Sequence, residues 1–190
     1  MKTTIGLASA SPRRHELLSL LQQPFEHVSI DVDEQLLPAE PAVDYVQRLA
    51  RTKAEAGFKA IGGSMPVLGA DTIVVIENQV LGKPADEADF TAMMQRLSGK
   101  IHQVHTAVAI ACQGRLLEQL VTSRVHFASL SEQMIADYWQ SGEPADKAGG
   151  YGIQGIGGRF VRYLEGSYSA VVGLPLYETD QLLQQLEVVT

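Results

Sequence analysis

The sequence contains little that would cross-link the chain or place it in a membrane. It has one cysteine in 190 residues, Cys112, so no internal disulfide can form. Cys112 lies in an apolar run, a position typical of a thiol that fills a core in a reducing compartment. The N-terminus lacks a long apolar segment, and no apolar run approaches the length of a membrane span. We therefore expect a cytoplasmic protein with no membrane partner.

Positive charge is also scarce. The 15 lysines and arginines are outnumbered by 22 acidic residues, which gives a net charge of −7. No basic stripe is present to neutralise a phosphate backbone, so we expect no nucleic-acid partner. A small anionic ligand is still compatible with this balance, because a local group of arginines and lysines can act within an acidic protein.

Several familiar catalytic and cofactor motifs are missing. The five histidines have no metal-site spacing with the cysteine, and no HExxH motif occurs. The glycine-rich stretch 146–159 has neither the Walker spacing nor the dinucleotide fingerprint. Ser9 and Ser11 have no recognisable base partner in the sequence, so a covalent serine mechanism is unsupported.

What the chain does have is an alternation of strand and helix patterns along its whole length. Its size predicts one domain over residues 1–190, or one domain with two lobes. Hairpins occur beside crossover helices, which predicts a mixed α/β sheet with helices packed around it. The patterns predict helices at 14–21, 44–58, 85–97, 131–140 and 175–186, and strands at 4–8, 25–30, 66–76, 101–111, 116–127, 160–164 and 169–172.

The junction between the first strand and the first helix is rich in hydroxyls and guanidiniums. Ser9, Ser11, Arg13 and Arg14 lie together there, and Ser11 is expected to cap the helix. Free backbone N–H groups and the positive end of the helix dipole favour an anion at such a corner, in particular a phosphate. The alternative is an ordinary helix start with surface arginines.

Two groups of acidic residues are candidates for chemistry. Asp71 interrupts the apolar strand at 66–76, where a carboxylate needs a partner, water or a metal. It is either a general base or metal ligand at a cleft, or a structural aspartate. The cluster of Asp31, Asp33 and Glu34 is either a solvated loop or, beside a triphosphate, a source of a ligand for Mg²⁺.

Lys53 and Lys83 are candidate phosphate contacts, with a surface lysine as the alternative for each. Lys53 lies about one helical turn after Leu49 and is expected to emerge beside the buried stripe of its helix. Lys83 stands between Gly82 and Pro84, so its backbone is constrained.

Together these pieces resemble the Maf family of nucleoside triphosphate pyrophosphatases, from Leu7 to about Leu186. Each motif is short, but their joint order is specific to that family. The motifs are Ser9-Ala10-Ser11-Pro12-Arg13-Arg14, Arg51-Thr52-Lys53-Ala54, Gly69-Ala70-Asp71-Thr72, Gly82-Lys83-Pro84, Leu97-Ser98-Gly99, Asp146-Lys147-Ala148-Gly149-Gly150-Tyr151-Gly152-Ile153-Gln154-Gly155 and Val172-Gly173-Leu174-Pro175-Leu176.

Within that family the chain resembles the branch that acts on dTTP and UTP. A sister branch, which acts on 7-methyl-GTP, typically has tyrosine where this chain has Arg13 and glutamine where it has Thr72. The sister branch also lacks the pattern around Gln154. The resemblance therefore implies that Arg13, Thr72 and Gln154 select the substrate.

The resemblance also implies a fold and a reaction. The fold is an elongated mixed sheet with flanking helices and two lobes around a deep cleft, related to inosine triphosphatases and often homodimeric. The reaction is hydrolysis of the α–β phosphoanhydride to a nucleoside monophosphate and pyrophosphate, with Mg²⁺ or Mn²⁺ as cofactor. Asp71 is the implied proton acceptor. With the corner described above, the expected phosphate contacts are Ser9, Ser11, Arg14, Lys53 and Lys83, and the expected metal ligands are Glu34 and Asp71.

Two other functions remain compatible with these residues. The substrate can instead be a modified pyrimidine triphosphate that the enzyme removes from the nucleotide pool. The chain can also be a regulator of septum formation that binds nucleotides without hydrolysing them. The presence of Asp71, Lys53 and Lys83 favours an enzyme.

Overall fold

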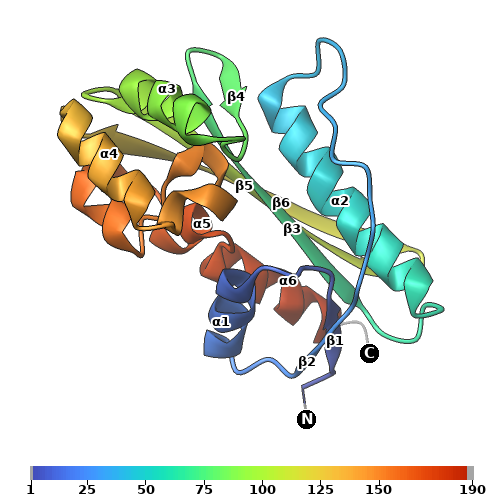
Figure 1. The fold of residues 1–190 in the computed structure, drawn as a ribbon. Helices are drawn as coiled ribbons and strands as arrows, with labels where there is room; N and C mark the ends of the chain where they lie inside the picture. Colours follow the sequence, from blue (N-terminus) through green and yellow to red (C-terminus); the bar gives the residue numbers. More distant parts are fainter. Residues whose placement is uncertain (1, 188–190) are drawn as a thin grey trace. The chain divides into compact units, whose positions relative to one another are not determined.

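The computed structural model describes residues 2–187 (Figure 1). Its strands are β1 (Ile5–Leu7), β2 (Phe25–His27), β3 (Val67–Ile76), β4 (Gln79–Leu81), β5 (Ile101–Cys112), β6 (Arg115–Phe127) and β7 (Val161–Glu165). They form a sheet in the order β2-β1-β3-β5-β6-β7, with β4 paired to β3. Strand β1 is parallel to both β2 and β3, whereas β4 is antiparallel to β3 and β7 is antiparallel to β6. The predicted mixed α/β sheet is therefore confirmed.

The helices also follow the predicted pattern closely. They are α1 (Pro12–Leu20), α2 (Ala42–Ala60), α3 (Glu87–Leu97), α4 (Glu132–Gln140), α5 (Tyr168–Val172) and α6 (Leu176–Glu187), with short 3₁₀ turns η1 (Glu143–Asp146), η2 (Ala148–Gly150) and η3 (Ile156–Phe160). Side-chain caps start α3 and α4, because Asp86 accepts a hydrogen bond from Asp89 N and Ser131 accepts one from Met134 N. No helix within residues 2–187 is long and apolar enough to cross a membrane.

Three local predictions are wrong. Ser11 is the N-cap residue of α1, but its side chain makes no capping hydrogen bond there. Residues 169–172 belong to helix α5 and not to a strand, because Ser167 Oγ accepts a hydrogen bond from Ala170 N at 3.2 Å and starts a helical turn. Strand β2 ends at His27, three residues earlier than predicted.

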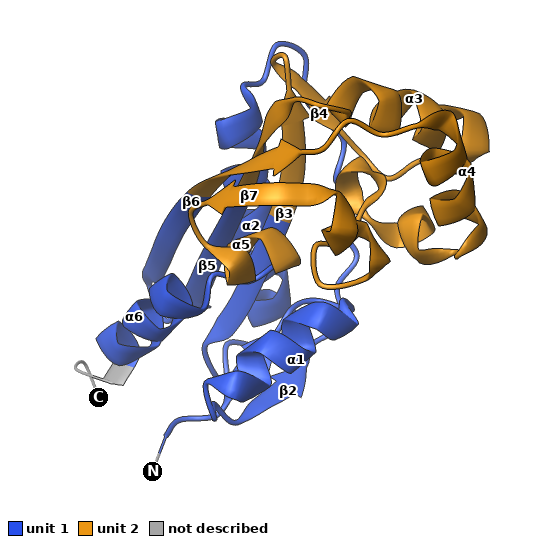
Figure 2. Ribbon diagram, turned by 90° about the vertical axis from the view of Figure 1, so that its left-hand side faces the viewer, with its two compact units in different colours: residues 1–71, 106–121, 173–190 blue, residues 72–105, 122–172 orange. Residues whose placement is uncertain are grey.

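The chain divides into two compact units (Figure 2). The first contains residues 1–71, 106–121 and 173–190, and the second contains residues 72–105 and 122–172. In the first unit, buried Val46, Leu49 and Ala54 lie on α2 and buried Ile5 and Leu7 on β1. The core of the second unit is rich in aromatic and sulfur-containing side chains, including Phe90, Met93, Met94, Phe127, Tyr138, Tyr151 and Phe160. That the two units form one domain over residues 1–190 stays a prediction.

Candidate active site

The close packing of helix α2 on strand β3 sets the geometry of the candidate site. A Cβ atom at Gly69 would lie 2.6 Å from Ala50 O and would also overlap Ala54, so glycine permits this approach. Lys53 is on the buried face of α2, and Asp71 follows two residues after Gly69 in β3. Two charged side chains are thus brought together at the contact between a helix and a buried strand.

Lys53 and Asp71 form a buried ion pair. Lys53 Nζ lies 2.7 Å from Asp71 Oδ1, and each residue is only 7% exposed. The same ammonium lies 2.8 Å from Glu34 Oε1, which reaches it from the exposed loop between β2 and α2. The ammonium supplies the counter-charge that a buried carboxylate requires. Lys53 is therefore buried between two carboxylates, and the alternative of a surface lysine is wrong.

The corner between β1 and α1 carries a second cation of this site. Arg14 Nη1 donates to Ser9 Oγ at 3.4 Å, and Arg14 Nε donates to Gly173 O at 2.9 Å. Ser9 Oγ also accepts a hydrogen bond from Ser11 N at 3.2 Å. Burial lowers the pKa of Arg14, and the negative charges of Asp71 and Glu34 oppose that effect. Arg14 is thus held in place by the corner and interacts electrostatically with both carboxylates.

Two contributors to this site were not foreseen from the sequence. Tyr45 Oη donates to the backbone carbonyl of Glu34 at 2.8 Å. Burial raises the pKa of Tyr45, and the charges of Asp71 and Glu34 raise it further. Tyr45 lies eight residues before Lys53 on α2, a spacing that could have drawn attention to it. Gly173 is far from Arg14 in the sequence, and nothing in its neighbourhood signals that its carbonyl accepts from an arginine.

The remaining predicted residues have less defined surroundings. In the first unit, Arg13 lies half-buried in α1, and Asp33 accepts a hydrogen bond from Gln35 N at 2.9 Å within the exposed loop. In the second unit, Thr72 is half-buried in β3, whereas Lys83 and Gln154 are exposed in loops. Their roles in phosphate binding and substrate selection stay predictions.

The carboxylates of the first unit fit a divalent cation of the kind that nucleotides carry. Within residues 2–187, no group of three or more His, Cys, Asp or Glu side chains is arranged to hold a metal. Mg²⁺ requires only one or two carboxylates when phosphate oxygens and water complete its coordination. Glu34 and Asp71 both contact the Lys53 ammonium, and they would supply the two carboxylates that such a cation requires.

The charges of the cluster also argue for an additional cation. Arg14 and Lys53 are positive and Glu34 and Asp71 are negative, so these four side chains sum to zero. A triphosphate would bring several further negative charges, and a metal held by the two carboxylates would offset part of them. The arrangement suits an anionic substrate that arrives with a metal ion.

The sequence matches known proteins over nearly its whole length. Residues 4–186 match the family model described as "Maf-like protein". A dTTP/UTP pyrophosphatase of Pseudoalteromonas translucida (strain TAC 125) is 59% identical over 184 residues, 97% of each sequence. One of Vibrio cholerae serotype O1 (strain ATCC 39315 / El Tor Inaba N16961) is 56% identical over 179 residues, covering 94% of this chain and 96% of the relative.

The fold is also found among solved structures. The Ham1 protein of Staphylococcus aureus superposes with a TM-score of 0.58 over 98% of this chain and 100% of that one. The two sequences are 13% identical, so this likeness concerns the fold alone.

Proposed function

Because the chain belongs to the family of Maf-like proteins, we propose that it hydrolyses dTTP and UTP to the nucleoside monophosphate and pyrophosphate. The geometric observation that supports this activity is the buried contact of Lys53 with Asp71, in which Glu34 shares the same ammonium. The proposal draws its substrates from relatives that are more than half identical over nearly the whole chain and are named dTTP/UTP pyrophosphatases.

In the proposed reaction, Asp71 orients a water molecule and accepts its proton. The water oxygen forms a bond to the α-phosphorus, the bond from that phosphorus to the bridging oxygen breaks, and pyrophosphate leaves with the electron pair. Lys53 fixes the Asp71 carboxylate through a 2.7 Å contact, so the base is oriented before the substrate binds. Positioning and charge neutralisation would supply most of the rate enhancement.

The phosphates would be bound by the cationic and hydroxyl side chains. We propose Ser9, Ser11, Arg14, Lys53 and Lys83 as their contacts. Mg²⁺ or Mn²⁺ would be held by Glu34 and Asp71, and a bound divalent cation would neutralise charge on the phosphate oxygens.

Arg13, Thr72 and Gln154 are the proposed selecting residues. The amide of Gln154 offers one acceptor and one donor, which matches the O4 and N3 edge of uracil or thymine. Cytosine presents the reverse pattern at N3 and N4, so an amide held in one orientation would discriminate between these bases. Acceptance of both dTTP and UTP requires tolerance at C5 of the base and at the 2′ position of the ribose.

A screen of pyrophosphate release over common and modified nucleoside triphosphates, with Mg²⁺ or Mn²⁺, tests this function. Turnover of dTTP and UTP is the expected result. Turnover of altered pyrimidine nucleotides alone would support removal of damaged nucleotides instead. Binding of dTTP without pyrophosphate release would support the non-catalytic regulator of septum formation.

A further inference from the structure

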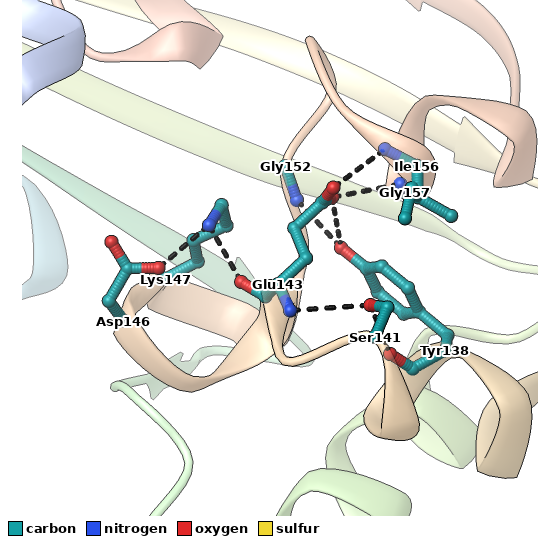
Figure 3. A network of polar contacts seen from close by, with 8 residues as sticks. All are labelled: Tyr138, Ser141, Glu143, Asp146, Lys147, Gly152, Ile156 and Gly157. Carbon is teal, nitrogen blue, oxygen red and sulfur yellow. Dashed lines mark hydrogen bonds and ion pairs between the residues drawn. The ribbon is translucent and has the colours of Figure 1, made fainter.

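The carboxylate of Glu143 is surrounded by hydrogen-bond donors from the glycine-rich loop of the second unit (Figure 3). Its Oε2 accepts from Ile156 N at 2.7 Å, and its Oε1 accepts from Gly157 N at 3.0 Å. Hydrogen bonds from backbone N–H groups to an ionised carboxylate are stronger than hydrogen bonds between two neutral groups. Glu143 therefore fixes the backbone immediately after Gln154, which lies two residues before Ile156.

Tyr138 links the same carboxylate to the other side of the loop. Its hydroxyl donates to Glu143 Oε1 at 2.7 Å and accepts from Gly152 N at 3.1 Å (Figure 3). The ring of Tyr138 is 1% exposed and packs edge-on against Phe160, with ring centroids 5.1 Å apart. Gln154 thus lies between two backbone segments that are both held by one network anchored in the core.

The loop approaches Glu143 and Tyr138 so closely that a Cβ atom at either of two glycine positions would collide with them. A Cβ atom at Gly155 would lie 2.6 Å from the Cδ atom of Glu143, and one at Gly157 would lie 2.6 Å from the Tyr138 hydroxyl oxygen. Glycine at 155 permits the loop to pack on the Glu143 carboxylate, and glycine at 157 permits it to pack on the Tyr138 hydroxyl. Direct contact with a ligand is not needed to explain them.

The protonation states of Glu143 and Tyr138 suit the hydrogen bond between them. Burial raises the pKa of Glu143, but the hydrogen bonds from Tyr138, Gly157 and Ile156 outweigh it and leave the pKa below its ordinary value. Burial raises the pKa of Tyr138, and the bond to Glu143 raises it further. At neutral pH an ionised acceptor therefore meets a neutral hydroxyl donor.

We propose that Glu143 is a positioning residue for base selection, because it holds the loop that presents Gln154. The inference rests on the proposed function, in which Gln154 reads the base. An amide on a mobile loop would pair with either hydrogen-bond pattern, so discrimination requires a fixed backbone beneath it. The network around Glu143 supplies that fixed backbone.

Glu143→Gln tests the proposal with little change in size. The new amide group places a donor where the carboxylate accepted, so one loop N–H or the Tyr138 hydroxyl loses its acceptor. We expect the ratio of kcat/KM for dTTP over dCTP to fall about tenfold, the cost of one misplaced hydrogen bond. Glu132→Gln, which removes the same charge from the exposed start of α4, should leave the ratio unchanged.

A double-mutant cycle separates positioning from general destabilisation. In a Gln154→Ala background, Glu143→Gln should change the ratio by less than about twofold, because its target is already absent. An equal effect in both backgrounds would overturn the proposal. If Glu143→Gln fails to fold, Tyr138→Phe replaces it in the cycle, since it removes two bonds of the network and retains the carboxylate.

Nuclear magnetic resonance provides a test that does not depend on activity. The amide protons of Ile156 and Gly157 should shift together as Glu143 is protonated in acid, and Glu143→Gln should abolish that titration. Absence of the shift in the wild type would overturn the proposal.

The outcomes also separate this proposal from the proposed function. A wild-type protein that releases no pyrophosphate from dTTP contradicts the function. An active wild type, with an unchanged ratio in Glu143→Gln, contradicts only the role of Glu143.

Discussion

Asp71 and Glu34 share the Lys53 ammonium as their partner. This sharing determines how removal of the Asp71 charge should affect stability and turnover. In Asp71→Asn, Lys53 retains Glu34 at 2.8 Å, so the buried cation stays paired and the fold should persist. We expect turnover of dTTP to fall by about two to four decades, because a general base is lost. Steady-state pyrophosphate release, together with thermal unfolding, measures both effects.

Asp137→Asn is the matched control, since Asp137 lies on the exposed face of α4 and its loss should leave turnover unchanged. Turnover at the wild-type level in Asp71→Asn would remove Asp71 from the role of proton acceptor.

His102 should make the stability of the protein depend on pH. Burial, assisted by the nearby His126, lowers the pKa of His102 to about 4. Between that value and about 6.5 the unfolded chain binds a proton that the folded chain does not, so stability falls as the solution is acidified. From pH 6.5 to pH 5 this residue alone should cost about 2 kcal/mol of unfolding free energy.

Urea unfolding at the two pH values measures that loss. His102→Gln should remove this part of the pH dependence, because its amide can still bond to the Tyr151 hydroxyl without titrating. His27→Gln, at an exposed position, should retain the wild-type dependence. An identical dependence in the wild type and His102→Gln would contradict the prediction.

At the scale of single residues, the sequence identified which side chains to consider but not how they meet. Asp71 and Lys53 stand out because each interrupts or borders an apolar pattern. The contact of Lys53 with Glu34 depends on how an exposed loop reaches a buried ammonium, which no local pattern encodes. Glu143 gave no signal at all, because a glutamate between Gly142 and Pro144 is typical of an ordinary turn.

At the scale of elements, the contact between α2 and β3 should be sensitive to one methyl group. In Gly69→Ala the new Cβ would meet the backbone of α2, with Ala50 O only 2.6 Å away. We expect a loss of about 1–3 kcal/mol of unfolding free energy, because backbone atoms must shift. Turnover should fall as well, since the shift would separate Lys53 from Asp71.

Urea unfolding provides the measurement, and Gly82→Ala is the control because an added Cβ there meets nothing within 4 Å. If Gly69→Ala is no less stable than Gly82→Ala, close packing of α2 on β3 does not require glycine at this position.

Helices and strands with a strong hydrophobic period or a side-chain cap were predictable from the sequence. Helix α2 has a continuous buried stripe, and α4 has both a stripe and the Ser131 cap. Helix α5 was missed because two valines in five residues favour a strand, whereas its start depends on a cap from Ser167.

At the scale of the whole molecule, the family resemblance leads us to expect a homodimer. Light scattering coupled to gel filtration should give twice the 20.6 kDa mass of the chain. A mass of one chain throughout a dilution series would contradict this expectation.

Contacts between distant parts of the chain were the least accessible to sequence reasoning. Arg14 donates to the carbonyl of Gly173, 159 positions later. Hydrophobic periodicity reports on neighbours within one element, so it cannot anticipate such a contact.

The discontinuous make-up of the first unit has a consequence for synthesis on the ribosome. That unit needs both the first 71 residues and the segment after residue 172, whereas the second unit ends at residue 172. Translation therefore completes the second unit before the first, although the second unit begins later in the chain. Residues 1–71, which bear Lys53 and Asp71, share their unit with residues made after position 172. A nascent chain would therefore acquire its reactive carboxylate arrangement only after those later residues have been synthesised.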